Sequence, residues 1–266
     1  YGTTTTATFA VNASGQERVL HQLAGGPDGD VEQGPLAYFK GELYGATQLG
    51  GLNTCSSGCG TVYAVTPSGA QHTVYRFKGK HDGIVPQGGL IVVNGALYGT
   101  TSYGGTHDAG TVYRITPSSQ KQIVYEFTNN DDGSYPTGTL AVSNGTLYVS
   151  ARYGGAHSYG TILAIAPSGK ATVLHAFSSG SDGRGPNGGL VVRKGILYGT
   201  TAEGGRSDDG TIFTLTKTGR EHVLYAFHGR DGATPLAGLA FVNGMLYGTT
   251  FGGGSAGKGT IFRFRP

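Results

Sequence analysis

Residues 97–119 read LYGTTSYGGTHDAGTVYRITPSS, and nearly the same string returns several times along the chain. Later copies are LYVSARYGGAHSYGTILAIAPSG at 147–169, LYGTTAEGGRSDDGTIFTLTKTG at 197–219 and LYGTTFGGGSAGKGTIFRF at 246–264. An earlier copy begins at Leu43, and the five Leu-Tyr pairs follow one another at intervals of 49 to 54 residues. A tandem repeat of this length indicates an array of similar structural units.

Four short segments recur within each repeat, and each has the composition of a β-strand. In the repeat that includes the quoted stretch they are residues 88–95 (GGLIVVNG), 96–101 (ALYGTT), 110–116 (GTVYRIT) and 122–127 (QIVYEF). Val, Ile, Leu, Tyr and Phe concentrate over four to seven residues, as in strands, and no segment has an apolar stripe of helical period.

The connections between these segments predict an antiparallel meander. The first and second segments are joined by Asn-Gly or Lys-Gly at 94–95, 144–145, 194–195 and 243–244. Asn-Gly favours a two-residue hairpin, because both turn residues need positive φ. The third and fourth segments are joined by turns of the TPSG type. Four-stranded meanders of about 50 residues, repeated in tandem, are typical of propeller blades.

We therefore predict an all-β fold in which residues 1–266 form a single β-propeller domain. Copies of the first segment near Gly34, Gly88, Gly138, Gly188 and Gly238 predict five blades of four antiparallel strands. The N-terminal strand ERVLHQL at 17–23 would join the C-terminal blade, close the ring and remove a free edge. That closure leaves one extra strand near 5–12, and a six-bladed ring with two incomplete blades is the alternative.

The composition excludes two classes of partner. The net charge is +3 and the 19 basic residues are scattered, so the chain has no clustered basic face for nucleic acid. No apolar run approaches the roughly 20 residues that cross a bilayer. We expect no membrane span and a monomer. No signal peptide stands at Tyr1, which is compatible with a mature form whose leader has been removed.

The two cysteines, Cys55 and Cys59, lie in the stretch CSSGC. Zinc would need four ligands, and no second Cys or His pair is near in the sequence. We predict a disulfide that closes this loop, which favours an oxidising compartment. The expected location is therefore extracellular or periplasmic, either secreted or on the cell surface.

The recurring pattern LYGTT, GG, GTVF, TP-G, LY-F, DG, P and GGL resembles the GloVer-type extracellular tandem repeat of bacterial secreted proteins. The resemblance extends from Tyr1 to Phe264 and implies a secreted or surface-displayed propeller-like array, without a specific activity or catalytic residue. The order of the segments is also loosely similar to quinone-binding propellers. Those use Trp in the outer strand, and this chain has none, so we predict no quinone and no other cofactor, with Ca²⁺ as the alternative.

Two residue types recur in every repeat and have competing explanations. The Asp-Gly pairs could bind sugar hydroxyls or Ca²⁺, or each Asp could form a local turn with its own backbone. The repeated Tyr could stack on sugar rings or fill the space between blades. Repetition in every blade favours the structural explanation for both. The residues are Asp28, Asp82, Asp132, Asp182 and Asp231, and Tyr44, Tyr98, Tyr148, Tyr198 and Tyr247.

Departures from the repeat are more informative about function. The stretch YVSARYGGAHSYG breaks the YGTT pattern and introduces Arg152, His157 and Tyr159. In an enzyme, Arg152 would neutralise the carboxylate of a uronic acid, and His157 or Tyr159 would move the protons of a β-elimination. Solvated loop residues chosen for polarity are the simpler explanation. The candidate binding residues are Tyr103, His107, Asp108, Tyr153, Glu203, Asp82, Asp132 and Asp182; no metal site is predicted.

Three functional hypotheses are compatible with the sequence. The favoured one is a secreted carbohydrate-binding, lectin-like propeller that recognises extracellular glycan through loops on one face. The second is a polysaccharide-degrading enzyme, a lyase or a glycoside hydrolase, with one asymmetric pocket at the mouth of the ring. The third is a structural or adhesive surface repeat. Propellers host all of these functions, so the fold alone does not choose among them.

Overall fold

The computed structural model describes residues 1–32 and 34–266. Over these residues the regular structure is β-strand, apart from three single-turn 3₁₀ helices: η1 (Gly26–Asp28), η2 (Lys80–Asp82) and η3 (Gly180–Asp182). The chain divides into two compact units, unit 1 (Tyr1–Glu126) and unit 2 (Phe127–Pro266). No helix in the described part of the chain is long and apolar enough to span a bilayer.

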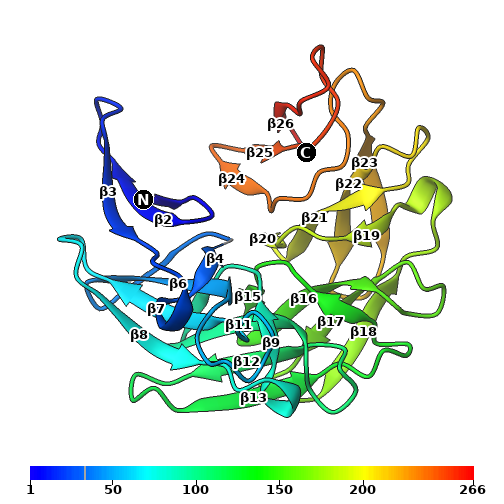
Figure 1. Cartoon of the computed structure of the whole chain (residues 1–266). Coiled ribbons are helices and arrows are strands. Elements are labelled where there is room, and N and C mark those ends of the chain that lie inside the picture. Colours follow the sequence, from blue (N-terminus) through cyan, green and yellow to red (C-terminus); the bar gives the residue numbers. More distant parts are fainter. Residues whose placement is uncertain (33) are drawn as a thin grey trace. The chain divides into compact units, whose positions relative to one another are not determined.

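Unit 1 contains three antiparallel sheets (Figure 1). The first consists of β1 (Gly2–Thr3), β2 (Ala7–Val11) and β3 (Glu17–Gln22). The second consists of β4 (Asp30–Glu32), β5 (Ala37–Phe39), β6 (Glu42–Leu49), β7 (Thr61–Val65) and β8 (Gln71–Arg76). The third consists of β9 (Ile84–Pro86), β10 (Ile91–Val93), β11 (Ala96–Tyr103), β12 (Thr111–Ile115) and β13 (Lys121–Glu126).

Unit 2 also contains three antiparallel sheets. The first consists of β14 (Ser134–Pro136), β15 (Ala141–Ser143), β16 (Thr146–Tyr153), β17 (Thr161–Ile165) and β18 (Ala171–Ala176). The second consists of β19 (Arg184–Pro186), β20 (Val191–Arg193), β21 (Ile196–Glu203), β22 (Thr211–Thr216) and β23 (Glu221–Ala226). The third consists of β24 (Ala240–Val242), β25 (Met245–Thr249) and β26 (Ile261–Phe264).

These sheets confirm the all-β propeller class and correct the number of blades. The described residues form six sheets, of which the first and the last have only three strands. The main prediction of five blades is wrong, and the six-bladed alternative agrees with the structure. The predicted closure is also wrong, because β3 pairs with β2 and not with the last sheet. The extra strand near residues 5–12 is β2, which gives β3 a partner of its own.

The predicted first strand at 88–95 forms over β10 only, and in four of the sheets a second short strand precedes it along the chain and pairs with the same neighbour. In the third sheet Ile91 of β10 pairs with Tyr98, while Pro86 of β9 pairs with Thr101 further along β11. The interruption holds the glycines of the GGL motif. A Cβ on Gly89 would lie 2.5 Å from Cδ of Pro35 in the preceding sheet. Glycine is required there because the backbones of adjacent sheets approach closely.

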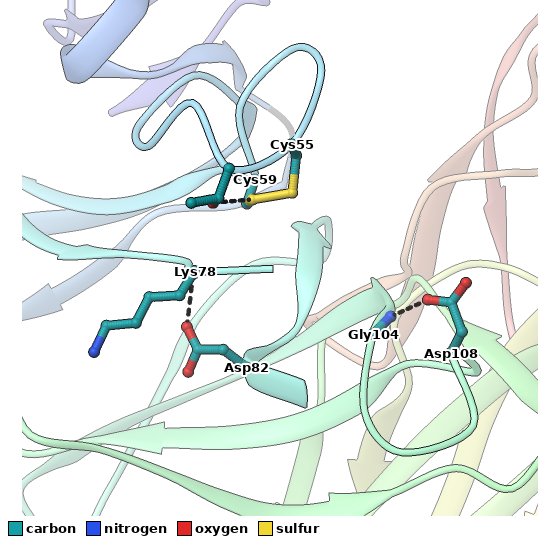
Figure 2. Close-up of a disulfide and its surroundings, with 7 residues drawn as sticks. Cys55, Cys59, Lys78, Asp82, Gly104 and Asp108 are labelled. Atoms are coloured by element: carbon teal, nitrogen blue, oxygen red, sulfur yellow. Dashed lines mark hydrogen bonds between the residues drawn. A yellow bond between two sulfur atoms is a disulfide. The ribbon is translucent and has the colours of Figure 1, made fainter. Parts of the chain in front are cut away.

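The hairpin turns form as the sequence predicts. Asn94 and Gly95 have φ of 48° and 75°, and the corresponding Asn or Lys and Gly of the other repeats have the same left-handed values. The predicted disulfide between Cys55 and Cys59 is also present, with a Cα–Cα distance of 5.3 Å (Figure 2). It closes the loop between β6 and β7, and a Cβ on Gly79 would lie 3.0 Å and 3.1 Å from its two sulfur atoms.

A glycine facing an aromatic ring recurs within several of the sheets. Gly99 pairs with Tyr113 across β11 and β12, and Gly199 pairs with Phe213 across β21 and β22. A Cβ on Gly199 would lie 2.6 Å from Cζ of Phe213, so the ring occupies the space that a side chain would need. In the sheet that departs from YGTT, the same position pairs Val149 with Leu163. A larger residue on one strand is matched by a smaller one on the other.

The second departure, at residue 151, also lies in the interior of the sheet. In other sheets two buried threonines face each other, as Thr101 and Thr111 do with hydroxyl oxygens 2.8 Å apart. Ala151 replaces the first of these, and the Thr161 hydroxyl donates to the Asp132 carbonyl at 2.8 Å, as the Thr260 hydroxyl does to the Asp231 carbonyl. The changes at 149 and 151 therefore repack the interior of one sheet, and only Arg152 of this stretch adds a charge.

Candidate functional site

The Asp-Gly pairs form local turns in both units. In four repeats the Asp carboxylate accepts a hydrogen bond from the backbone N–H four residues earlier; in the fifth the donor is three residues earlier. The N···O distances are 3.0 Å for Ala24–Asp28, 2.8 Å for Lys78–Asp82 (Figure 2), 2.9 Å for Thr128–Asp132, 2.7 Å for Ser178–Asp182 and 3.0 Å for His228–Asp231. This geometry favours the structural explanation of the repeated Asp.

A His or Tyr from the preceding strand also contacts several of these carboxylates. The Nε2 atom of His175 lies 3.0 Å from Asp182, and the Tyr75 hydroxyl donates to Asp82 at 2.9 Å. Burial tends to raise the pKa of Asp182, but the hydrogen bonds from His175 and Ser178 outweigh this effect and lower the pKa. Ligand binding by Asp82, Asp132 and Asp182 stays a prediction, and any ligand would compete with these internal bonds.

Asp82 has a further partner in Lys121, at the start of β13. The Lys121 side chain is only 3% exposed, and its Nζ lies 3.0 Å from Asp82 Oδ1. Burial lowers the pKa of Lys121, and the Asp82 carboxylate opposes that shift. The pair joins two successive repeats of unit 1 and leaves little of the Asp82 carboxylate for an external ligand.

The loop that follows β11 holds three of the predicted binding residues of unit 1. Tyr103 is 42% exposed at the end of the strand. Asp108 accepts a hydrogen bond from the Gly104 N–H at 2.8 Å (Figure 2), and its own φ is 54°. His107 is exposed beside it. Asp108 therefore shapes the loop, whereas Tyr103 and His107 present side chains to the solvent.

The corresponding loops of unit 2 bring together a denser set of polar and aromatic side chains. Tyr153 and Tyr159 are 48% and 38% exposed. The Arg152 guanidinium lies 5.2 Å from the centre of the Tyr153 ring, and the Arg184 guanidinium lies 5.9 Å from that of Tyr159. A Cβ on Gly185 would lie 3.9 Å from Cγ of Arg152, so Arg152 also adjoins the strand that starts with Arg184.

Arg184 links this set to the predicted binding residue Glu203. Its Nε donates to Glu203 at 2.8 Å, and its Nη2 donates to Asp208 at 2.8 Å. Both carboxylates are about half exposed, which limits the contribution of these ion pairs to stability but leaves their oxygen atoms accessible. We call the set Arg152, Tyr153, Tyr159, Arg184 and Glu203 the Arg152 surface.

Asn187 supports the Arg152 surface and has no counterpart among the residues that sequence reasoning selected. Its Oδ1 accepts hydrogen bonds from the Thr137 hydroxyl at 3.0 Å and from Arg152 Nη1 at 3.4 Å, and its Nδ2 donates to the Leu236 carbonyl at 3.2 Å. The signal available in the sequence was its place directly after Pro186, where other repeats have Gln87, Thr137 and Leu236. It is a variable position in an otherwise regular motif.

The three residues proposed for β-elimination occupy different parts of this region. Arg152 contacts Tyr153 and Asn187, while Tyr159 lies under Arg184. His157 is exposed in the loop. Within the described residues, no hydrogen bond, ion pair or ring contact joins any two of the three. Their catalytic roles stay a prediction.

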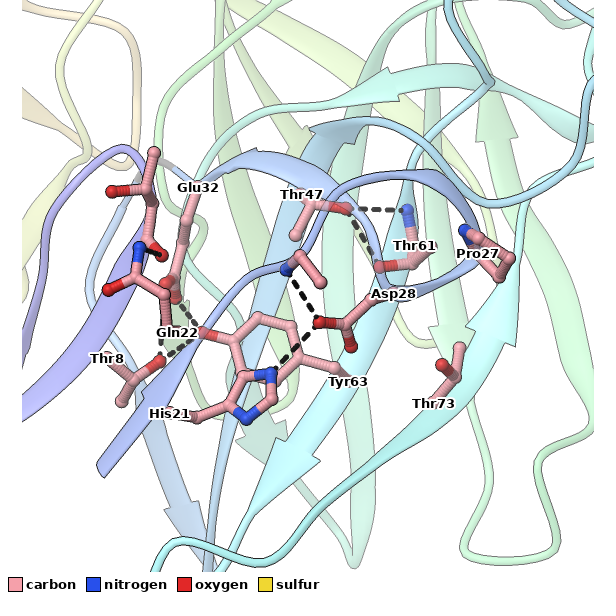
Figure 3. A network of polar contacts seen from close by, with 12 residues as sticks. Thr8, His21, Gln22, Pro27, Asp28, Glu32, Thr47, Thr61, Tyr63 and Thr73 are labelled. Carbon is pink, nitrogen blue, oxygen red and sulfur yellow. Dashed lines mark hydrogen bonds and ion pairs between the residues drawn. The ribbon is translucent and has the colours of Figure 1, made fainter. Parts of the chain in front are cut away.

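Sequence reasoning missed a buried polar network in unit 1 (Figure 3). Glu32, at the end of β4, stands where the other repeats have Pro, and it is 2% exposed. The Tyr63 hydroxyl donates a hydrogen bond to Glu32 Oε1, and the Thr8 hydroxyl lies 2.8 Å from the Tyr63 oxygen. Burial raises the pKa of Glu32 to about 8, while hydrogen bonds from Tyr63 and Thr8 oppose the rise.

This buried network is structural and does not face the solvent. Glu32, Tyr63 and Thr8 come from two successive sheets and are all buried. The replacement of Pro by Glu was the sequence signal that could have found it. As for metals, residues 1–32 and 34–266 contain no group of three His, Cys, Asp or Glu side chains arranged to hold an ion. The Ca²⁺ alternative stays a prediction.

Comparisons with known proteins agree with the repeat and the fold. A family model described as the Gloeobacter/Verrucomicrobia repeat matches residues 1–210 and 51–262. No curated protein matches the chain by sequence. A gluconolactonase of Xanthomonas campestris has a similar structure, with 17% identity and a TM-score of 0.60 over 98% of this chain and 80% of that one. A Bacteroides thetaiotaomicron protein of unknown function has 14% identity and a TM-score of 0.58, over 95% and 62% of the two chains. At these identities the likeness concerns the fold.

Proposed function

The chain belongs to the Gloeobacter/Verrucomicrobia repeat family, and from this premise we propose that it is a secreted, carbohydrate-binding propeller. Saccharide binds at the Arg152 surface of unit 2. The observation that supports this most directly is that exposed Tyr153 and Tyr159 lie beside accessible guanidinium and carboxylate groups. Sugar recognition needs this combination, because a pyranose has apolar C–H faces and polar hydroxyl edges.

The Cys55–Cys59 disulfide supports the proposed location. Disulfides persist in oxidising compartments and are rare where glutathione keeps thiols reduced. We accordingly place the protein outside the cytoplasm and expect it to act as a monomer. Sedimentation at several protein concentrations would distinguish a monomer from an adhesive surface repeat that self-associates.

A glycan array followed by calorimetry with the best saccharide tests the proposal. Tyr153→Ala should weaken binding by about 10-fold or more, because stacking against an aromatic face contributes a large share of such contacts. Tyr38→Ala is the matched control: Tyr38 is 64% exposed, but it lies on β5 in unit 1. No bound saccharide, or an equal loss in both variants, would contradict the proposal.

Product assays with the same protein distinguish binding from catalysis. A lyase would release an unsaturated uronate with a new ultraviolet absorbance, and a hydrolase would release reducing ends. We expect neither signal during prolonged incubation with a bound polysaccharide. If such a product formed with the wild type and disappeared in His157→Ala, the enzyme hypothesis would replace this one.

A further inference from the structure

Arg152 differs from Arg184 and Lys121, the two other cations placed near the predicted binding residues. The Arg184 guanidinium is paired with Glu203 and Asp208, and the buried Lys121 is paired with Asp82. Arg152 has no carboxylate partner within the described residues; its contacts are the Tyr153 ring and the Asn187 amide oxygen. An arginine held on a partly exposed surface without a counter-charge is suited to receive an anionic group.

The position of the Arg152 guanidinium is set by its neighbours. Asn187 Oδ1 accepts from Arg152 and from the Thr137 hydroxyl, and the Thr137 residue is only 6% exposed. The Asn187 amide nitrogen is also bound to the Leu236 carbonyl. Asn187 is therefore a positioning residue with little freedom of its own. A guanidinium has five N–H donors, and this contact uses one, so most of the fork remains for a ligand.

The groups beside Arg152 match a sugar that carries an acid. Tyr153, which the guanidinium contacts, is nearly half exposed. In a hexuronate the carboxylate is attached directly to the pyranose ring, so an acid on Arg152 places the ring near Tyr153. The nearby carboxylates Glu203 and Asp208 are both paired with Arg184, which reduces their repulsion of an anionic ligand.

We propose that the Arg152 surface selects acidic saccharides, and that the Arg152 guanidinium binds the carboxylate of a hexuronate unit. This inference rests on the proposed carbohydrate-binding function and adds the class of ligand. The other repeats have Gln48, Ser102, Ala202 and Phe251 at the corresponding position, so within these repeats the acidic specificity belongs to one site in unit 2.

The test compares two forms of one oligosaccharide by calorimetry. The probes are an oligogalacturonate and the neutral oligosaccharide obtained by reducing its carboxylates. The wild type should bind the acidic form about 10-fold or more tightly, since a charge-assisted, bidentate hydrogen bond is stronger than a neutral one. The preference should shrink as the salt concentration rises.

Two variants assign the preference to Arg152. Arg152→Ser introduces the residue that the preceding repeat has at position 102 and should abolish the preference for the acidic form. Arg193→Ser makes the same change in net charge at β20, whose strand pairs with the opposite end of β21 from Glu203. It should leave the preference unchanged. Circular dichroism and thermal melting would verify that both variants are folded.

Each outcome has a distinct meaning. Equal wild-type affinity for the acidic and neutral forms would overturn this inference and leave the proposed function in place. A preference that survives Arg152→Ser, or that Arg193→Ser reduces as much, would also overturn it, because the effect would then follow net charge. Failure of both forms and of the glycan array to bind would contradict the proposed function itself.

Discussion

At the scale of single residues, the interior of each sheet depends on matched sizes across two strands. Gly199 faces Phe213, and Val149 faces Leu163 at the corresponding place in another sheet. Valine has a higher strand propensity than glycine, so propensity alone would favour valine at both positions. The close approach of the Phe213 ring overrides that preference at residue 199.

We predict that Gly199→Val destabilises the protein by roughly 1–3 kcal/mol, because the new side chain overlaps the Phe213 ring. The double variant Gly199→Val with Phe213→Leu, which copies the Val149–Leu163 pair, should recover about 1 kcal/mol or more of that loss. Urea denaturation of the wild type, both single variants and the double variant would measure the coupling. Strictly additive effects would contradict this account.

The buried carboxyl group of Glu32 makes the stability of the fold depend on pH. Its folded-state pKa of about 8 lies above the ordinary value of 4.5. Between these two values the folded protein binds more protons than the unfolded chain. The carboxyl group therefore makes the folded state progressively less stable as the pH rises from about 4.5 to about 8.

We predict that Glu32→Gln flattens this part of the pH–stability profile and raises stability above pH 8, by on the order of 2 kcal/mol. Glutamine can still accept from Tyr63 and cannot ionise. Thermal melting between pH 5 and pH 9 would follow the effect. Glu17→Gln, on the exposed surface of β3, is the control and should follow the wild-type profile. Parallel profiles for Glu32→Gln and the wild type would show that burial of this carboxyl does not govern the pH dependence.

At the scale of elements, the Asp-Gly turn explains why several motifs recur together. The carboxylate caps the backbone that follows the fourth strand, and a Tyr or His from that strand contacts the same carboxylate. The LY-F and DG parts of the repeat thus belong to one hydrogen-bonded unit. The loop between β6 and β7 is shaped differently, because the Cys55–Cys59 disulfide closes it.

We predict that Cys55→Ser with Cys59→Ser destabilises the protein by at most about 2 kcal/mol, since a disulfide that closes so short a loop restricts the unfolded chain little. Hydrogen exchange should rise in residues 50–60 and remain unchanged in β11 and β12. Melting with and without a reducing agent would give the same difference for the wild type. A loss of the whole fold on reduction would show that the loop organises more than itself.

At the scale of the whole molecule, the described residues form six sheets, three in each of the two compact units. The prediction that residues 1–266 form a single domain is a statement about cooperativity as well as shape. In repeat proteins, stability is approximately a sum of the repeats and their nearest-neighbour interfaces, and adjacent repeats unfold together when those interfaces are strong.

We propose that the chain unfolds as one cooperative domain. Gly199→Val, which perturbs unit 2, should then lower the protection of the slowest-exchanging amides in β7 of unit 1 as much as in β22. Native-state hydrogen exchange with mass spectrometry measures both. A loss of protection confined to unit 2 would show that the two units unfold independently.

The class of fold was predictable because strand, turn and period are local properties. Asn94-Gly95 specifies its hairpin through backbone sterics, and the apolar runs specify the strands. The number of blades was not predictable in this way. Residues 17–22 had a choice between the last sheet, which is distant in the sequence, and the adjacent strand Ala7–Val11, and the structure shows the adjacent one.

The candidate site, too, was only partly predictable from the sequence. The departure from the repeat pointed to Arg152, and exposure of Tyr153 and Tyr159 is compatible with the predicted binding face. The variable position after Pro186 marks Asn187, but its role could not be predicted, because it acts through Thr137 and Arg152, which are 50 and 35 residues away in the sequence. The replacement of Pro by Glu marks Glu32 in the sequence, but its partners Thr8 and Tyr63 are distant along the chain and could not be predicted.

By itself, the amino-acid sequence determined the repeated antiparallel meander, its turns and the disulfide loop, because each depends on residues close together along the chain. Only the tertiary structure decided that there are six sheets, that Val149 and Ala151 serve packing, and that Arg152 lacks a carboxylate partner among the described residues. The physical reason is that size matching, burial and charge pairing are properties of residues brought together from distant parts of the chain.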